Sequence, residues 1–481
     1  MKRKAILKLL FFLILMYALA MIFPLGIAVF LGEAEMIRGF AVTITIAVAA
    51  ALPVYLLTRK TAIRFTAKDG FMLVFLAWVM ASVTGALPYW ISRCIPGFTD
   101  AVFESVSGFS TTGTSIIADL DIMPRSLIFW RAETHWLGGM GMVVLTVALF
   151  PFLGIGGFQI LKAEFNGPEK ERITPKITET AKILWLLYVS LTFIETILLV
   201  IAGMTWYDAI IHAFSTMGTG GFSSRNNGLA YWNSPAIVWI VSVFMLIAGY
   251  NFTLIYRLLQ RKWKDVWYSS EGRAYIGIIV ISTLITTVSG SLTGRAGSST
   301  NLRNGFFYTV SVLTTTGLTA GGQSLLTPLA KAALFCLMFI GGCSGSTAGG
   351  VKVIRHVVLF KQAGNEIKKI IYPQGVFSVR LNNKVGRKDV VYGVAGFIVM
   401  YFAVTIAGGL IIAGSGLNHI DSFNMALLSL GNFGIDPVTF DSVTSIINLP
   451  NYAKWTISFL MLTGRLELWT IFVFFSREYW Q

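Results

Sequence analysis

Long apolar segments alternate with short polar connectors along almost the whole chain. Residues 1–58 contain two of these segments, near 6–31 and 37–58. A bilayer crossing needs about 20 apolar residues in a helix, so this region predicts a transmembrane helical hairpin. The basic first residues resemble a signal peptide, but the apolar run exceeds the roughly 7–15 residues of a cleaved signal. This length favours a retained first span.

After the hairpin a unit recurs four times. Each unit has a long apolar segment, a shorter amphipathic stretch rich in Gly, Ser and Thr at its end, and a second long apolar segment. The units span residues 69–160, 175–260, 272–358 and 387–478. Together with the hairpin they predict an all-α membrane protein with ten spans and four shorter segments.

The four shorter stretches align without gaps, which is the signature of an internal repeat. They start at Asp100, Asp208, Asn304 and Asp421, and in each a glycine follows 13 residues later, at Gly113, Gly221, Gly317 and Gly434. Asp and Asn are good N-caps and Gly is a good helix stop. A helix of about ten residues rises about 15 Å, half the hydrocarbon thickness. Each stretch is therefore expected to enter the membrane and return on the same side.

Composition and charge place this architecture in a membrane. With 55% hydrophobic and only 13% charged residues, the chain leaves no room for a soluble catalytic domain. The net charge is +15, and 28 of the 38 Lys and Arg residues lie in residues 2–8, 59–68, 162–182, 257–273 and 352–388 and at Arg477. Basic residues gather in cytoplasmic connectors, so these stretches and both termini are expected inside. The charge thus indicates topology rather than nucleic-acid binding, and the shorter segments enter from outside.

Four re-entrant segments indicate a common pore. Irregular backbone at membrane depth is tolerated where it is buried in protein or lines a water-filled cavity. Four parallel helix–pore loop–helix repeats around a pseudo-fourfold axis meet that condition together. Backbone carbonyls in an extended strand can replace the hydration shell of a cation, and glycine permits the conformations that keep them inward. A single glycine of this kind would rather indicate close helix packing or a simple turn, but four in register favour a filter.

Six motifs carry a resemblance to a known family. They are Ser110 to Gly113, Thr219 to Ser223, Thr314 to Gly317, Gly431 to Gly434, Trp136 to Gly141 and Gly341 to Gly350. Over essentially its whole length the chain resembles the Trk/Ktr/HKT superfamily of cation transporters, and its added hairpin resembles the Trk branch. One departure is that Ile435 and Asp436 follow Gly434, where the family commonly has Gly-Pro-Gly nearby.

The resemblance implies a function and a set of site residues. It implies potassium uptake across the bacterial inner (cytoplasmic) membrane, by a homodimer with a cytoplasmic nucleotide-binding regulatory subunit. Potassium would be both cargo and filter ligand, with no organic cofactor. The filter residues would be Thr111, Thr112, Gly113, Thr219, Gly220, Gly221, Thr315, Thr316, Gly317, Asn432, Phe433 and Gly434.

A glycine-rich run interrupts the apolar stretch near residues 332–358. It includes Gly345, Ser346, Thr347, Ala348, Gly349 and Gly350. Because glycine destabilises a helix by about 1 kcal/mol relative to Ala, a break at mid-membrane is expected. The break is either a kink needed for packing or, as the resemblance implies, a loop that closes the pore below the filter.

Arg465 is expected midway through the last span, near residues 452–476. A central arginine costs at least about 2.5 kcal/mol and should face protein or water. It either pairs with Glu467 or a carbonyl as a structural contact, or, as the resemblance implies, lies beside the pore where it opposes cation passage.

Other polar residues have more ordinary explanations. Glu133, His135, Glu195 and His212 are interpreted mainly as structural hydrogen-bonding groups. The basic stretch 359–388 is either a solvated connector at the membrane surface or the docking site of a regulatory subunit.

Two other classes of function are less well supported. An intramembrane enzyme would need paired carboxylates or a nucleophile–base set, but the four histidines are far apart in sequence. A secondary transporter commonly has inverted repeats, whereas these repeats run parallel. Within the same fold, channel-like conduction, weak selectivity between K⁺ and Na⁺, and sodium- or proton-coupled symport all remain open.

Overall fold

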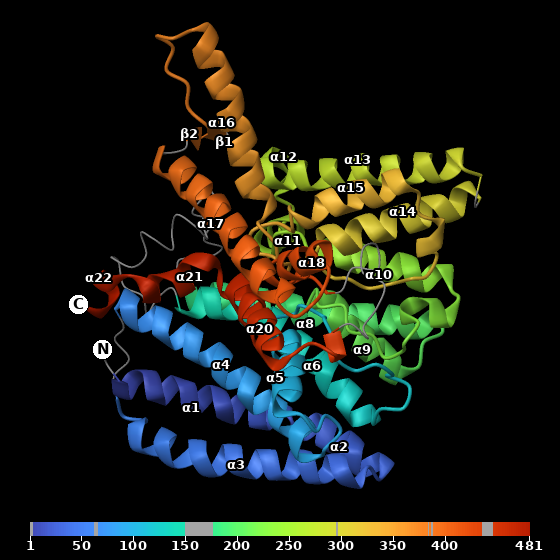
Figure 1. Cartoon of the computed structure of the whole chain (residues 1–481), viewed down its shortest axis with the longest axis vertical. Coiled ribbons are helices and arrows are strands. Elements are labelled where there is room, and N and C mark those ends of the chain that lie inside the picture. The colour runs from blue at the N-terminus through green and yellow to red at the C-terminus, as the bar shows by residue number, and fades with distance from the viewer. Residues whose placement is uncertain are drawn as a thin grey trace.

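The computed structural model describes residues 3–61, 66–149, 177–294, 297–382, 384–385, 388–434 and 446–481. Over these residues the chain is a bundle of helices, most of them running side by side, from which one helical arm projects (Figure 1). The expected end of the first unit at 150–160 and most of the basic stretch 162–182 lie outside the described residues. The unit boundaries therefore stay predictions.

The N-terminal hairpin packs on the first repeat. It comprises α1 (Arg3–Ala20), α2 (Ile22–Leu31) and α3 (Ala34–Thr58). Residues 4–31 form one apolar stretch of 28 residues, so α1 and α2 together make the expected first span. Phe23 and Phe30 on α2 are largely exposed, as side chains that face lipid would be.

The four repeats share one order of elements: a long helix, a short helix, a loop and a further helix. Repeat 1 contains α4 (Ala67–Ile91), α5 (Phe98–Phe109) and α6 (Arg125–Leu149). Repeat 2 contains α8 (Ile177–Ile201), α9 (Trp206–Met217), η1 (Gly228–Trp232), α10 (Pro235–Ala248) and α11 (Phe252–Leu259). Repeat 3 contains α13 (Ser270–Leu292), α14 (Ser298–Leu313), η2 (Gln323–Leu325), α15 (Pro328–Met338) and α16 (Val353–Ile371). Repeat 4 contains α17 (Lys388–Ala413), α18 (His419–Leu430), α20 (Asn451–Leu466) and α21 (Leu468–Phe472).

The remaining elements lie in connectors and at the C-terminal end. They are α12 (Trp263–Tyr268), η3 (Val473–Phe475) and α22 (Arg477–Trp480), together with strands β1 (Arg380–Leu381) and β2 (Lys384–Val385). The two strands form a small antiparallel ribbon. The expected all-α architecture of four helix–loop–helix repeats and a hairpin is confirmed.

Second helices of the repeats are bent more often than the sequence indicated. Six described helices are long and apolar enough to cross a membrane, and eight if each bent pair counts as one span. The bent pairs are α10 with α11, at 102°, and α20 with α21, at 111°. Ten spans were expected, so two are not among these eight. One begins with α6, which carries several charged residues, and the other with α15, which has only 11 residues.

The short helices begin earlier than the expected caps. Asp208 lies in the first turn of α9, and the N-cap is Thr205. The Asp208 N–H donates to the Thr205 hydroxyl, which in turn donates to the Asp208 carboxylate. Asp100 and Asp421 also lie in first turns, and α14 begins six residues before Asn304. An acidic residue inside the first turn suits the positive end of the helix dipole, which explains the recurring Asp.

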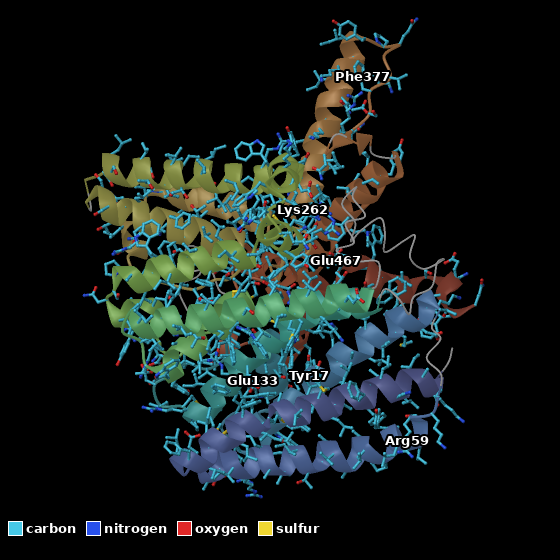
Figure 2. All side chains as sticks on the ribbon, turned by 180° about the vertical axis from the view of Figure 1, so that it is seen from behind. Tyr17, Arg59, Glu133, Lys262, Phe377 and Glu467 are labelled. Carbon is cyan, nitrogen blue, oxygen red and sulfur yellow. The ribbon has the colours of Figure 1, made fainter. Side chains whose placement is uncertain are left out.

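Basic stretches that are distant in sequence meet in the structure. Lys8 donates to the carbonyl of Arg59 at 2.6 Å, and Lys68 donates to the carbonyl of Glu478 at 2.7 Å. The N- and C-terminal ends therefore lie on one side of the molecule (Figure 1). The arm formed by α16 and the strand ribbon projects from the bundle, with Phe377 near its tip (Figure 2).

Candidate functional site: a ring of four loops

Each short helix ends in the same turn. The first loop residues Thr111, Thr219, Thr315 and Asn432 all have a positive φ, of 54°, 53°, 56° and 51°. This left-handed conformation is uncommon outside glycine and is an outlier for β-branched Thr. Its recurrence at four equivalent positions shows that one backbone design is repeated around the molecule.

Two backbone hydrogen bonds hold each turn. In repeat 1, the N–H of Thr111 donates to Gly108 and the N–H of Thr112 donates to Ser107, at 3.0 and 2.9 Å. The same pair of bonds recurs from Thr219 and Gly220, from Thr315 and Thr316, and from Asn432 and Phe433. This is the pattern of a Schellman cap. The chain therefore leaves each helix in a fixed direction.

The four loops close into a ring, called here the four-loop ring and made of residues 110–113, 218–221, 314–317 and 431–434. A Cβ added to Gly113 would lie 1.9 Å from the carbonyl oxygen of Gly220, and one added to Gly221 would lie 2.0 Å from that of Thr316. A Cβ on Gly317 would lie 3.6 Å from the nitrogen of Gly434, and one on Gly434 would lie 3.0 Å from the oxygen of Thr112. Each loop thus contacts the next, and the fourth contacts the first.

Hydroxyl groups stiffen parts of the ring. Ser110 and Thr112 are hydrogen-bonded at 2.7 Å, and Thr314 and Thr316 repeat this contact at the same distance. Asn432 donates to the Thr112 hydroxyl at 3.2 Å and to the Met461 carbonyl at 2.7 Å. The first and fourth loops are therefore joined directly.

The position before the ring glycine differs between repeats for a steric reason. Thr112, Thr316 and Phe433 occupy it in three repeats, whereas the second repeat has Gly220. A Cβ on Gly220 would lie only 2.1 Å from Nδ1 of His135. The buried His135 ring, stacked on Phe222 at 4.0 Å, thus fills the space that a side chain has elsewhere.

The glycine motif at 136–141 brings α6 against the ring. A Cβ on Gly138 would lie 1.9 Å from the carbonyl oxygen of Phe109, and one on Gly139 would lie 2.8 Å from the Cα of Gly218. In repeat 4, a Cβ on Gly464 of α20 would lie 2.0 Å from the Leu430 oxygen. These glycines let the second helix of a repeat touch the end of a short helix.

The expected helix break lies directly against the ring. Between α15 and α16 the chain is non-helical from residue 339 to 352, and this stretch is called here the broken segment. Its Gly349 N–H donates to the Thr315 hydroxyl at 2.7 Å, and its Gly350 N–H donates to the Gly431 carbonyl at 2.9 Å. The Thr347 hydroxyl donates to the Met217 carbonyl at 2.9 Å. The broken segment therefore contacts the second, third and fourth repeats at the level of the loops.

Three buried cations bind carbonyls of the broken segment. Arg465 donates to Thr347 at 2.8 Å, Arg355 donates to Val351 at 3.0 Å, and Lys352 donates to Ala348. All three side chains belong to residues that are at most 7% exposed. A small cavity next to the fourth loop is lined by these cations together with Asn432 and Glu467. The cavity wall therefore carries more positive than negative charge.

Arg465 lies midway through the last span, as expected, but at a bend that was not expected. It lies in the last turn of α20, because the helix ends at Leu466 and the chain turns at Glu467, which has a φ of 61°. Its second partner is the carbonyl of Gly138, at 2.8 Å. The expected alternative of a carbonyl partner is found, whereas Glu467 pairs with Arg355.

The other sequence candidates are buried among the helices. Glu133, His135, Glu195 and His212 are at most 5% exposed. His212 makes two hydrogen bonds, to the Asp208 carbonyl at 2.8 Å and to the Ser223 hydroxyl at 3.2 Å, as a structural role requires. Lys352 and Arg355 were missed by the sequence analysis, where they counted only as part of a cytoplasmic basic stretch.

The donor set suits a weakly held alkali cation better than a transition metal. Among the described residues, no three His, Cys, Asp or Glu side chains gather as metal ligands. The four-loop ring instead offers backbone carbonyl and hydroxyl oxygens, which suit hard cations. Ile435 and Asp436, the departure from the family pattern, lie outside the described residues.

Comparisons with known proteins agree with this architecture. The family model described as "TrkH: Cation transport protein" matches residues 35–279 and 276–481. The chain is 36% identical to the Trk system potassium uptake protein TrkH of Escherichia coli (strain K12), over 99% of both chains. It is 35% identical to the protein of the same name from Halomonas elongata, over 100% of both.

A solved structure extends the similarity to three dimensions. The crystal structure of the potassium transporter TrkH from Vibrio parahaemolyticus matches with a TM-score of 0.90 and 32% identity, over 100% of both chains. Sequence and fold therefore agree over the full length. The chain is a multi-pass membrane protein and belongs to the TrkH family of cation transport proteins.

Proposed function

We propose that this protein takes up potassium across the bacterial cytoplasmic membrane by conduction through the four-loop ring. The observation that carries the proposal is the cyclic contact of the four loops, each built on the same Schellman turn. Carbonyl oxygens in such a ring replace the hydration shell of K⁺. Relatives named as potassium uptake proteins of a Trk system give further support.

In this proposal the filter consists of the last three residues of each loop of the ring, which are residues 111–113, 219–221, 315–317 and 432–434. The cation binds there only in transit, and the protein uses no organic cofactor and catalyses no covalent reaction. Gly113, Gly221 and Gly317 each have a positive φ. In this conformation the backbone carbonyls of the loops can bind the cation, and the absence of a Cβ lets neighbouring loops touch.

The broken segment is the proposed gate. Residues 345–350 and Arg465 lie against the ring and close the path from its inner side. The support is that backbone groups of Gly349 and Gly350 bond the third and fourth loops, while Arg465 holds Thr347. Opening would require these contacts to break together, so the gate would be two-state.

The projecting arm is the proposed docking site for a cytoplasmic nucleotide-binding regulatory subunit. Phe360, Ile370 and Val376 are 77%, 80% and 96% exposed, although the arm lies outside the apolar spans. The printed names of the relatives refer to a system, which suits a partner of this kind. We also propose a homodimer, embedded in membrane lipid, with both termini cytoplasmic, as the shared side of the basic stretches supports.

Rubidium and sodium flux through purified protein in liposomes tests the conduction proposal. Because the proposed gate closes the pore, the wild type and a variant lacking residues 346–349 are assayed in parallel. We expect rubidium flux in the variant that is blocked more strongly by K⁺ than by Na⁺. An absence of flux from both folded proteins would contradict the proposal. Flux that requires an imposed Na⁺ or H⁺ gradient would instead favour coupled symport on the same fold.

A further inference from the structure

In the first three repeats, one position on the short helix contacts the chain that leaves the loop. Four residues after Asp100, Asp208, Asn304 and Asp421 stand Glu104, His212, Tyr308 and Met425. All four are at most 1% exposed. Three of the side chains are polar and the fourth is apolar, although they occupy the same position of a repeated helix.

In repeat 1 this position holds the strand through a carboxylate. Glu104 accepts hydrogen bonds from the hydroxyl of Ser115 and the backbone N–H of Ile116, both at 3.0 Å. Ser115 stands two residues after the ring glycine. Arg131 of α6 fixes the carboxylate with a 2.6 Å ion pair and also donates to the Ser115 hydroxyl at 3.0 Å.

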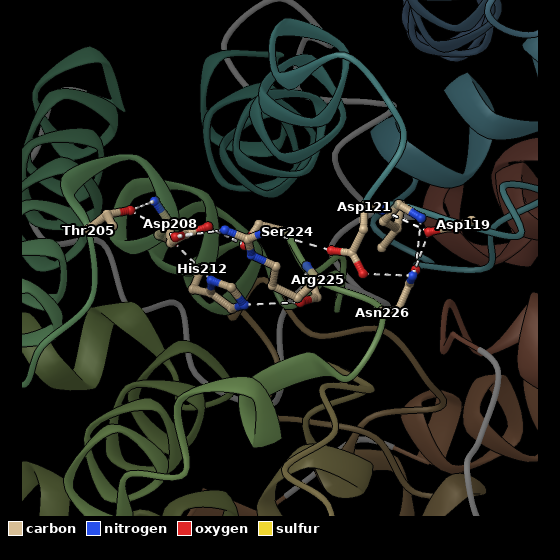
Figure 3. Close-up of polar contacts among 10 residues, drawn as sticks. Asp119, Asp121, Thr205, Asp208, His212, Ser224, Arg225 and Asn226 are labelled. Atoms are coloured by element: carbon tan, nitrogen blue, oxygen red, sulfur yellow. Dashed lines mark hydrogen bonds and ion pairs between the residues drawn. The ribbon is translucent and has the colours of Figure 1, made fainter.

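In repeat 2 an imidazole replaces the carboxylate. His212 contacts the Asp208 carbonyl through Nδ1, so Nδ1 carries the proton and Nε2 is left to accept from the Ser223 hydroxyl. Ser223 is equivalent to Ser115, and each accepts a backbone N–H from two residues further on. Figure 3 shows His212 on the same helix as Asp208, beside Ser224 and Arg225.

Repeats 3 and 4 complete the comparison. The hydroxyl of Tyr308 donates to the carbonyl of Gly321 at 2.8 Å, so a third polar group holds the third strand. Met425 has only a thioether, a weak acceptor, at the position where the other repeats have strong hydrogen-bonding groups. Residues 435–445, which follow the fourth loop, lie outside the described residues.

We propose that Glu104, His212 and Tyr308 are positioning residues that set the ion preference of the ring by fixing the strands that follow it. The inference rests on the proposed role of the ring as a filter. Among the described residues the chain after the first three ring glycines is irregular. Side-chain bonds of this kind therefore help to hold the spacing of the oxygens next to those glycines, beside a backbone bond such as that from the Leu229 N–H to the Thr319 carbonyl. A strand released from its bond lets the oxygens close on a smaller ion, which lowers the preference for K⁺ over Na⁺.

A double-mutant cycle on the neutral pair His212 and Ser223 tests the proposal. The measurement is the ratio of Na⁺ to K⁺ concentrations that half-inhibit rubidium uptake by full-length protein in liposomes. His212→Phe and Ser223→Ala should each lower this ratio by about three- to tenfold, the range expected for one hydrogen bond. The double variant should lower it no further than Ser223→Ala alone, because that change already removes the contact with His212, together with the bond from the Arg225 N–H. Losses that multiply would overturn the proposal.

Two control variants separate the possible failures. Met425→Leu, at the same helix position without a strong bond, should leave the ratio unchanged. Gly221→Ala, within the ring itself, should lower it. An unchanged ratio in both His212→Phe and Ser223→Ala, with a loss in Gly221→Ala, would overturn the positioning role and leave the filter standing. An unchanged ratio in Gly221→Ala as well would overturn the filter. Should His212→Phe not fold, Ser223→Ala carries the comparison alone.

Discussion

Glu467 forms an ion pair with Arg355 at 2.5 Å, although Arg465 is only two residues away along the chain. Glu467 stands where α20 ends and α21 begins, and Arg355 lies in the first turn of α16. The pair therefore joins the bend of the last span to the helix that follows the broken segment (Figure 2 shows Glu467 within the bundle). Arg465 is left to bind backbone carbonyls of two other repeats.

The first prediction concerns this ion pair. Glu467→Gln should lower the thermal stability of the purified protein, because an unpaired buried charge costs about 3–5 kcal/mol. Arg355→Gln should be similarly harmful. The double variant should be more stable than either single variant, since neither member of this pair is then left without its partner. Melting temperatures in detergent measure this, and a double variant less stable than both singles would show that the two side chains act independently.

A second prediction concerns Arg465. Arg465→Gln removes a charge-assisted bond to Thr347, worth about 1.5–3 kcal/mol, and a positive charge beside the proposed path. Rubidium uptake per folded protein should rise by about tenfold, since 1.4 kcal/mol corresponds to that factor. A fall in uptake together with a lower melting temperature would show that Arg465 serves the fold alone.

Lys454→Gln is a matched control for Arg465→Gln. Lys454 is a buried cation on the same helix, but its partner is Asp100, at 2.6 Å, rather than the broken segment. We expect this substitution to affect stability without raising uptake. A rise in both variants would indicate a general loosening of α20.

A third prediction concerns the broken segment. Removing residues 346–349 eliminates the contacts of Thr347 with Met217 and of Gly349 with Thr315. Uptake without any regulatory subunit should therefore increase. Reduced uptake by a correctly assembled deletion protein would favour the alternative that the break serves packing.

A fourth prediction concerns the steric contact between Gly220 and the His135 ring. Gly220→Ser should impair folding or uptake, because its Cβ would lie 2.1 Å from the imidazole. A combined Gly220→Ser and His135→Ala variant should recover part of the loss, since the other repeats have a side chain at this position. The measurement is the yield of folded protein in a size-exclusion profile. A double variant with no better yield than Gly220→Ser would contradict the steric explanation.

The sequence predicted the repeated plan but not the local geometry. Glycines spaced 13 residues from a capping-type residue were sufficient to indicate four equivalent loops. The left-handed Thr111 and its equivalents were not foreseen, because a positive φ at Thr is rare and arises here from the Schellman bonds. The helix starts were misplaced because Asp inside a first turn and Asp at an N-cap both satisfy the dipole.

Contacts between distant residues were the other part that sequence patterns did not reveal. Arg355 and Glu467 are 112 positions apart. From the sequence, Glu467 had a nearer candidate partner in Arg465, and Arg355 counted only as part of a basic connector. The break in the third repeat was predicted because glycine disfavours helix. The bend at Glu467 has a much weaker signal, since Gly464 is the one glycine near it and the other surrounding residues are compatible with a continuous helix.

The most direct test of the central claim compares Gly113→Ala, Gly221→Ala and Gly317→Ala with the wild type by Na⁺ and K⁺ competition on rubidium uptake. All three glycines have positive φ, but an added Cβ would meet a carbonyl oxygen at 1.9 Å from Gly113 and 2.0 Å from Gly221, against 3.6 Å to the nearest atom from Gly317. The account predicts that all three lose preference for K⁺, and that Gly317→Ala loses least. Unchanged preference in all three folded variants would contradict conduction through the four-loop ring.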